Sequence, residues 1–144
     1  MKKNPFYFIQ TNTILKKINK VKSIYEKYEK VLCHNDLLFA NFLYSKDRSY
    51  LIDYEYSGKN IALFDVVSYL NENNINDESK QLEFIKQYYK IIDEELLNDI
   101  NIMFSFLDVL WGYWGFAMYK MYKNKTFLSI GEEKKSRYHS RFCN

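Results

Sequence analysis

Three polar side chains in the first half of the chain could together bind a divalent cation. Asp36 and Asn41 are five residues apart beside short apolar runs, and Asp53 ends a later apolar run. Two carboxylates and an amide oxygen are hard oxygen ligands of the kind that suits Mg²⁺. Because Mg²⁺ keeps several waters and usually binds together with phosphate groups, this set indicates phosphate chemistry.

A β-hairpin would bring these three residues together. Apolar runs at residues 41–44 and 49–53 flank the polar stretch 45–48, which is typical of a hairpin. The two ends of a hairpin lie side by side, so Asp53 could approach Asn41 and Asp36. Taken singly, residues 34–36 could be a polar turn, Asn41 a turn former and Asp53 a strand-end cap. The joint pattern favours a site.

Helical periodicity accounts for most of the remaining chain, which predicts a mostly α fold of the α+β class. Apolar residues recur every three or four positions in the amphipathic stretch 11–30, and residues 31–33 form a short apolar run. Gly58 marks a loop. Asp77 and Asp93 are plausible N-caps, and Gly112 and Gly115 could interrupt the longest helix. The helices predicted after the hairpin cover residues 61–70, 78–92, 94–123 and 132–142.

Composition excludes several classes of protein. The 144 residues are 47% hydrophobic, 19% aromatic and 27% charged, which indicates one packed domain and excludes a disordered or collagen-like chain. The net charge of +3 is too weak and too mixed to favour nucleic acid as a partner. Asn and Lys are common and Ala is rare, which indicates a coding bias, so clusters of Asn carry little weight.

Cysteine spacing and hydropathy indicate a cytoplasmic protein. Cys33 and Cys143 form neither a zinc motif nor a disulfide framework, which favours a reduced compartment, and no signal peptide is evident. Residues 100–118 are mostly apolar, but Asp108 lies at their centre. A central Asp costs about 3 kcal/mol on insertion into a membrane. This stretch is therefore predicted to be a buried core helix without membrane insertion.

The pattern His34-Asn35-Asp36-Leu37 with Asn41, followed by Ile52-Asp53-Tyr54, resembles the catalytic core of the kinase-like phosphotransferases. The resemblance implies that Asp36 accepts the proton of a substrate hydroxyl, with Asn41 also in the catalytic loop. It implies that Asn41 and Asp53 hold Mg²⁺ on the phosphates of ATP. His34 would support the loop.

Residues 53–72 narrow this resemblance to the choline/ethanolamine kinase family, whose members carry I-D-x-E-Y, then an Asn, an F-D and a Glu. The matching residues are Asp53, Glu55, Tyr56, Asn60, Phe64, Asp65 and Glu72. The resemblance implies that Asp65 braces the catalytic loop by hydrogen bonds and that Glu55 is structural. It implies that Glu72 and Tyr56 contact the substrate. Tyr54 departs from the Phe or Trp usual in the family.

Trp111 and Trp114 are three residues apart, so on a helix they share one face. Core packing is the ordinary reason for such a pair. The family, however, has a W-x-x-W helix after its catalytic core, and the resemblance implies that these indoles line a pocket for a trimethylammonium group. Aromatic faces and a carboxylate such as Glu72 suit a cation that cannot donate hydrogen bonds.

The resemblance implies that residues 1–144 form the C-terminal lobe of the protein-kinase-like fold. Only 33 residues precede the catalytic loop, and no Gly precedes Gly58, so we expect the N-terminal ATP-binding lobe to be absent. The chain would then be a domain fragment or a truncated product, inactive alone. The surface left exposed would be partly apolar and could favour a homo-oligomer.

The resemblance implies ATP-dependent phosphorylation of choline to phosphocholine. Two alternatives stay open. One is a related phosphotransferase acting on ethanolamine or an aminoglycoside. The other is an inactive lobe that serves only as an interaction module.

Overall fold

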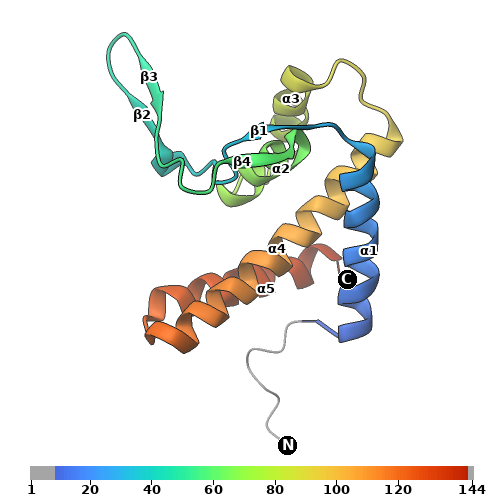
Figure 1. Cartoon of the computed structure of the whole chain (residues 1–144), viewed down its shortest axis with the longest axis vertical. Helices are drawn as coiled ribbons and strands as arrows, with labels where there is room; N and C mark the ends of the chain where they lie inside the picture. Colours follow the sequence, from blue (N-terminus) through green and yellow to red (C-terminus); the bar gives the residue numbers. More distant parts are fainter. Residues whose placement is uncertain (1–8, 143–144) are drawn as a thin grey trace, which may run out of the picture. The chain divides into compact units, whose positions relative to one another are not determined.

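The computed structural model describes residues 9–142, which form ten short and long elements of mainly helical structure (Figure 1). The described part divides into two compact units. One contains residues 23–101, and the other contains residues 9–22 and 102–142. The predicted fold class, mostly helical with a little strand, is confirmed.

Helix α1 (Thr11–Lys27) and strand β1 (Lys30–Cys33) are the first two elements of the described chain. The predicted helix over residues 11–30 therefore ends three residues early. Strand β1 pairs antiparallel with β4 (Gly58–Ile61), with Cys33 opposite Gly58. The prediction that Gly58 marks a loop is wrong, since it begins a strand. This strand has one apolar residue, Ile61, so the sequence carries no alternating pattern that would reveal it.

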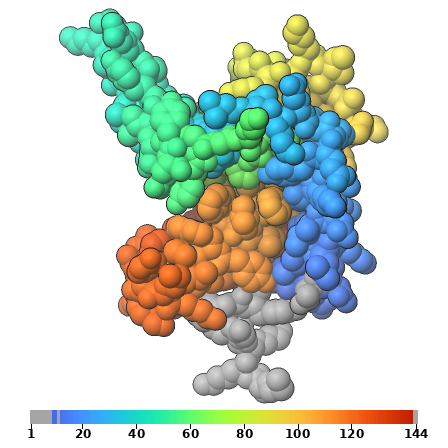
Figure 2. Space-filling view, viewed as in Figure 1, coloured from blue at the N-terminus to red at the C-terminus, as the bar shows by residue number. Residues whose placement is uncertain are grey.

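The predicted hairpin is confirmed. Strand β2 (Phe42–Tyr44) pairs antiparallel with β3 (Ser49–Leu51), and the turn closes through a 2.8 Å hydrogen bond from Ser45 N to Arg48 O. A 3₁₀ turn, η1 (Phe39–Asn41), leads into it. The hairpin extends away from the rest of its unit as a narrow arm (Figure 2). Its apolar side chains include the exposed residues Leu43, Tyr44 and Tyr50.

Helix α2 (Ala62–Glu72) supplies much of the core of the 23–101 unit. Its wholly buried side chains include Leu63, Val67 and Leu70. Asp77 caps helix α3 (Glu78–Tyr88), as predicted, by accepting a 3.0 Å hydrogen bond from Lys80 N. Helix α3 ends four residues before the predicted residue 92. Because Asp93 must lie outside a helix to cap the next one, a short connecting segment has to come first.

Helices α4 (Glu94–Tyr122) and α5 (Lys125–Phe142) run back along one another beyond residue 101 (Figure 1). Asp93 caps α4 through a 2.8 Å bond from Leu96 N. Gly112 and Gly115 do not interrupt the helix. A Cβ atom on Gly115 would lie 2.8 Å from Gly131 N and 2.9 Å from Phe127 O, so this glycine permits close contact between the two helices.

Helix α5 begins seven residues before the predicted residue 132. Its first residues include several of modest or low helix propensity: Thr126, Phe127, Ser129, Ile130 and Gly131. Packing on α4 outweighs this propensity. The ring of Phe127 lies edge-on to that of Trp114, with 5.5 Å between centroids, and Gly131 lies directly against the Phe116 ring.

Asp108 is the charged residue in the apolar part of α4, and it is wholly buried. Its Oδ1 atom accepts a 2.8 Å hydrogen bond from Arg137 Nε and forms an ion pair with Arg137 Nη2 at 2.6 Å, and Arg141 Nη1 lies 3.8 Å from Oδ2. A buried carboxylate is tolerated when it is paired and hydrogen-bonded in this way. Across residues 9–142, no helix is both long and apolar enough to span a membrane.

Candidate active site

Asn41 and Asp36 are in direct contact. The Nδ2 atom of Asn41 donates a 2.8 Å hydrogen bond to the backbone oxygen of Asp36 and a 3.2 Å bond to its Oδ2 atom. Asn41 is buried at the end of η1, whereas Asp36 is partly exposed. Because Nδ2 faces Asp36, the Oδ1 atom of Asn41 faces away and can act as a ligand. This oxygen has no hydrogen-bond partner among the described residues.

The segment before Asp53 is fixed to the same loop by its backbone. Ile52 N donates a 2.9 Å hydrogen bond to the backbone oxygen of Asn41. Ile52 O lies 2.9 Å from His34 Nε2, and Asp36 N donates to His34 Nδ1 at 3.3 Å. Since Nδ1 accepts, the ring proton is on Nε2, which donates to Ile52. His34, only 5% exposed, therefore ties the loop to the residue preceding Asp53.

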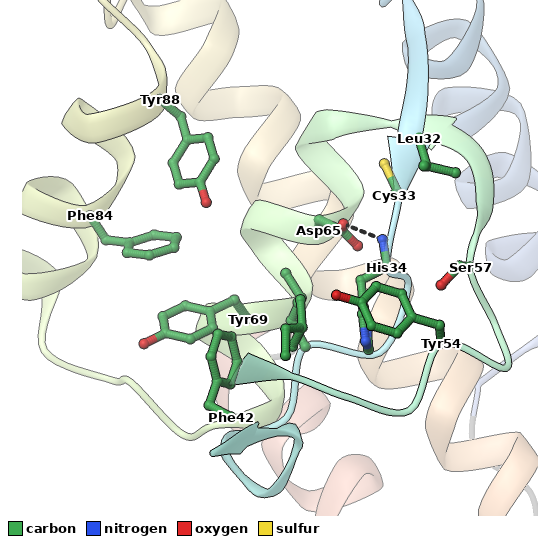
Figure 3. Close-up of a pocket in the computed structure, with 12 residues that line it drawn as sticks. Leu32, Cys33, His34, Phe42, Tyr54, Ser57, Asp65, Tyr69, Phe84 and Tyr88 are labelled. Carbon is green, nitrogen blue, oxygen red and sulfur yellow. Dashed lines mark hydrogen bonds between the residues drawn. The ribbon is translucent and has the colours of Figure 1, made fainter. Parts of the chain in front are cut away.

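Asp65 holds the loop from helix α2. Its Oδ2 accepts a hydrogen bond from His34 N and its Oδ1 accepts one from Asn35 N, both at 2.8 Å; Figure 3 shows the bond to His34. Asn35 has a positive φ of 67°, a conformation that Asn tolerates better than most residues. Its side chain donates to Tyr56 O and accepts from Asn60 Nδ2, both at 2.8 Å. These bonds fix the backbone directly before Asp36.

Negative charge gathers around Tyr56. The charge of Glu55 raises the pKa of the Tyr56 phenol most, and Asp36 and Asp53 add smaller contributions. Neither Asp36 nor Asp53 forms a salt bridge with a Lys or Arg in the part of the chain that the structure describes. Asp53 has a φ of 66°, a strained conformation for a residue that is not glycine and one that recurs at functional sites.

This donor set fits Mg²⁺. It offers carboxylate oxygens and the outward Oδ1 of Asn41, and within residues 9–142 neither Asp36 nor Asp53 has a salt bridge that would compensate its charge. Clusters of three or more His, Cys, Asp or Glu residues that could hold a metal are absent from residues 9–142. A candidate site here thus depends on the amide of Asn41 together with Asp36 and Asp53.

A cavity of about 450 Å³ lies beside the loop in the same unit (Figure 3). Five Phe and Tyr side chains and three Leu side chains line it, and Cys33 and Asp65 contribute polar atoms. Burial, followed by the charge of Asp65, raises the pKa of the Cys33 thiol to about 11. The thiol is therefore protonated at neutral pH and is unsuited to act as a nucleophile. Lining residues are Leu32, Cys33, His34, Leu37, Phe42, Leu51, Tyr54, Ser57, Asp65, Tyr69, Phe84 and Tyr88.

The residues predicted to bind substrate fall in both units. Glu72, the last residue of α2, belongs with the catalytic loop and accepts a 3.4 Å hydrogen bond from Asn71 Nδ2. Trp111 and Trp114 belong to the other unit. Their rings are nearly perpendicular, at 85°, with centroids 5.9 Å apart. Phe127 adds a third ring, at 86° to Trp114, that the sequence analysis did not assign.

The sequence analysis also missed Asn73, which caps the end of α2 and bonds to the backbone of the catalytic loop. Asn73 lies in the polar stretch 71–76. Because Asn is common throughout this chain, a cluster of Asn residues does not by itself indicate a functional position. Its partners are 34 and 36 residues away in the sequence, so spacing alone could not reveal the contact.

Three known proteins illustrate what the chain is similar to. Protein LicA of Haemophilus influenzae is 33% identical over 90 residues, which cover 60% of this chain and 33% of LicA. Ethanolamine kinase 2 of Rattus norvegicus is 48% identical over 44 residues, which cover 29% of this chain and 11% of the kinase. The crystal structure of a choline/ethanolamine kinase family protein from Mesorhizobium loti superposes with a TM-score of 0.74 at 21% identity, covering 94% of this chain and 48% of that one.

The chain thus spans a third of the length of LicA and about half of the solved structure. The sequence model of the family described as choline/ethanolamine kinase matches residues 1–139, which is nearly the whole chain. The fold, the sequence relatives and this match agree, and the chain belongs to the choline/ethanolamine kinase family.

Proposed function

We propose that this chain supplies the catalytic loop and the substrate-binding half of a kinase that transfers the γ-phosphoryl group of ATP to the hydroxyl of choline. The observation that carries the proposal is the contact between Asn41 and Asp36, at 2.8 and 3.2 Å, beside the segment that ends in Asp53. This contact supports the proposal, because phosphoryl transfer requires a base close to oxygen ligands for a metal ion.

Asp36 would act as the base. As the choline oxygen forms its bond to the γ-phosphorus, the bond from that phosphorus to the bridging oxygen of ADP breaks, and the hydroxyl proton moves to Asp36. The products are phosphocholine and ADP. His34 and Asp65 hold the backbone on either side of Asn35 through buried or partly buried hydrogen bonds. Their role would be to keep Asp36 in place.

Asn41 and Asp53 would hold Mg²⁺. When bound with ATP, this ion supplies the positive charge that neutralises the transferring phosphoryl group. The carboxylates that raise the Tyr56 pKa leave a local excess of negative charge, which a divalent cation would relieve. The chain would act as the C-terminal lobe of a kinase whose nucleotide site includes another lobe, in keeping with its span of about half of the solved relative.

Choline recognition would involve Trp111, Trp114, Tyr56 and Glu72. The two indole rings are nearly perpendicular, with centroids 5.9 Å apart. A quaternary ammonium is stabilised by aromatic ring faces by about 0.5–2 kcal/mol per contact. The carboxylate of Glu72 would balance the charge.

Ethanolamine is the second candidate substrate. The 48% identity to an ethanolamine kinase over 44 residues favours it. Its ammonium group can donate hydrogen bonds, so it would depend more on Glu72 and less on the indoles. An aminoglycoside would need several acidic residues rather than an aromatic pair. A chain acting only as an interaction module would need no acceptor substrate. A homo-oligomer would form through the surface that faces the N-terminal lobe in a complete kinase.

A substrate comparison tests the proposal. Phosphate transfer from ATP to choline, ethanolamine and an aminoglycoside is measured with the 144-residue chain and with the complete protein that its gene encodes, whatever the length of that protein. We expect the complete protein to have its highest kcat/KM with choline. A higher kcat/KM with ethanolamine would reassign the substrate, and no transfer to any acceptor would support the interaction module.

A further inference from the structure

We propose that Asn73 is a positioning residue that fixes the catalytic loop on the far side of Asp36 from Asp65. Asn73 caps helix α2, and its side-chain amide bonds to two residues of the loop. The inference rests on the proposed phosphoryl transfer but concerns a residue outside the motifs that suggested it.

The amide of Asn73 uses both of its ends. Its Oδ1 atom accepts a 2.6 Å hydrogen bond from Phe39 N. Its Nδ2 atom donates to Leu37 O at 2.7 Å and to Tyr69 O at 2.8 Å. Because the partners are one N–H group and two carbonyls, only one orientation of the amide satisfies all three. Asn73 therefore links the last turn of α2 to the residues on both sides of Leu38.

One helix thus holds the loop at two points. Asp65, in the first turn of α2, accepts hydrogen bonds from the N–H groups of His34 and Asn35. Asn73, at the other end of α2, bonds to Leu37 and Phe39. Asp36 lies between these two attachments. The rigid helix fixes the distance between them and hence the backbone that carries the base.

The second attachment also acts on Asn41. The 3₁₀ turn η1 begins at Phe39, and Asn41 N donates a 2.9 Å hydrogen bond to Leu38 O. If Phe39 loses its partner on Asn73, the turn that presents the Asn41 amide loses its anchor. A displacement of about 1 Å in a reacting group can lower a rate by about 100-fold.

Two substitutions separate the functions of this amide. Asn73→Asp keeps an acceptor for Phe39 N but places a carboxylate oxygen against the carbonyls of Leu37 and Tyr69. Asn73→Ala removes all three bonds. Asn98→Asp, on the exposed surface of α4, makes the same change in charge away from the loop and serves as the matched control.

The experiment has two measurements. Amide hydrogen exchange of the folded chain should show faster exchange at Phe39 and Asn41 in Asn73→Ala, with core amides of α2 unchanged. In the complete protein, both Asn73 variants should lose about 10- to 100-fold in kcat, while the KM for the acceptor and for ATP changes less than threefold. Circular dichroism measures the folded fraction of each variant, and kcat is calculated per folded molecule, so that a loss of folded protein is not counted as a loss of kcat.

The two hypotheses fail differently. Faster exchange with an unchanged kcat would overturn the positioning role and leave the kinase proposal intact. Unchanged exchange at Phe39 and Asn41 in Asn73→Ala would show that Asn73 does not anchor the loop, and would overturn the positioning role. If the wild-type protein transfers no phosphate to any acceptor, the proposed function fails, and the exchange measurement alone decides whether Asn73 fixes the loop.

Discussion

Asn41 bonds through one nitrogen atom to both the backbone and the carboxylate of Asp36, at 2.8 and 3.2 Å. This contact orients the amide, so its Nδ2 atom faces Asp36 and its Oδ1 atom faces away. It also places a hydrogen-bond donor on the carboxylate that we propose as the base. In the proposed mechanism, this amide would lie between the carboxylate that accepts the proton and the oxygen that binds the cation.

Asn41→Asp should abolish this arrangement. The new carboxylate cannot donate to Asp36, and two like charges in contact repel one another. We expect kcat to fall by about 100-fold or more, since the base and the cation site are both disturbed. The same substitution at Asn98 should leave kcat within twofold of wild type. Steady-state kinetics with choline and ATP make the comparison, and equal losses at the two positions would refute the role of Asn41.

Asp65→Asn should lower the pKa of the nearby Cys33 thiol. The pKa of this thiol is raised from its ordinary value of 9.0 to about 11, first by burial and then by Asp65. Removing the carboxylate should lower the pKa, so that alkylation by iodoacetamide at pH 9 becomes faster. A Cys143→Ser background leaves Cys33 as the single thiol. Asp47→Asn, in the exposed hairpin turn, is the control, and an unchanged rate in Asp65→Asn would contradict the expected coupling.

The raised pKa of the Cys33 thiol also makes the free energy of unfolding depend on pH. Because the pKa of Cys33 is higher in the folded state than its ordinary value, the folded state keeps its proton where the unfolded chain loses it. This contribution to the free energy of unfolding is present below pH 9 and is lost as the pH rises towards 11. Urea unfolding of wild type and Cys33→Ala between pH 8 and 11 checks the difference. A gap between the two that stays constant over this range would contradict it.

Asp108→Asn should destabilise the unit that contains α5. The substitution leaves Arg137 next to an uncharged partner in a buried position, and breaking a buried ion pair costs about 3–5 kcal/mol. Glu132→Gln, on the exposed face of α5, removes a charge without breaking a buried pair. Urea unfolding should show a loss of about 3 kcal/mol or more for the first variant and less than about 0.5 kcal/mol for the second. Equal losses would show that the pair contributes little.

Gly115→Ala should destabilise the contact between α4 and α5. The new Cβ would meet backbone atoms of Gly131 and Phe127 at 2.8 and 2.9 Å, which flexible side chains cannot relieve. Overpacking of this kind costs about 1–3 kcal/mol, which outweighs the gain in helix propensity of about 1 kcal/mol. No atom lies within 4 Å of a Cβ added to Gly58, so Gly58→Ala should be neutral or slightly stabilising. Thermal unfolding of both variants measures the contrast, and a stabilised Gly115→Ala would contradict the close approach.

Short-range signals in the sequence were sufficient for some elements. The hairpin followed from two apolar runs around a polar turn, and Asp77 and Asp93 were identified as caps from their positions before apolar periodicity. In each case the residues that decide the structure lie within a few positions of one another. The roles assigned to Asp36, Asn41, Asp53 and Glu72 stay predictions.

Elements that depend on distant partners could not be predicted. Strand β4 forms because β1 lies beside it, and the start of α5 depends on the packing of Phe127 against Trp114. Asn73 contacts residues more than 30 positions away. A sequence pattern contains no record of such contacts, so the second attachment of the catalytic loop was visible only in the structure.

Substitution of Asp36 tests the central claim most directly. Asp36→Asn keeps the size of the side chain but cannot accept the hydroxyl proton, and loss of a general base lowers rates by about 100- to 10,000-fold. In the complete protein, we predict a fall in kcat for choline phosphorylation within this range, with the KM for choline nearly unchanged. Asp47→Asn should retain wild-type activity. A kcat for Asp36→Asn within twofold of wild type would contradict the assignment of Asp36 as the base.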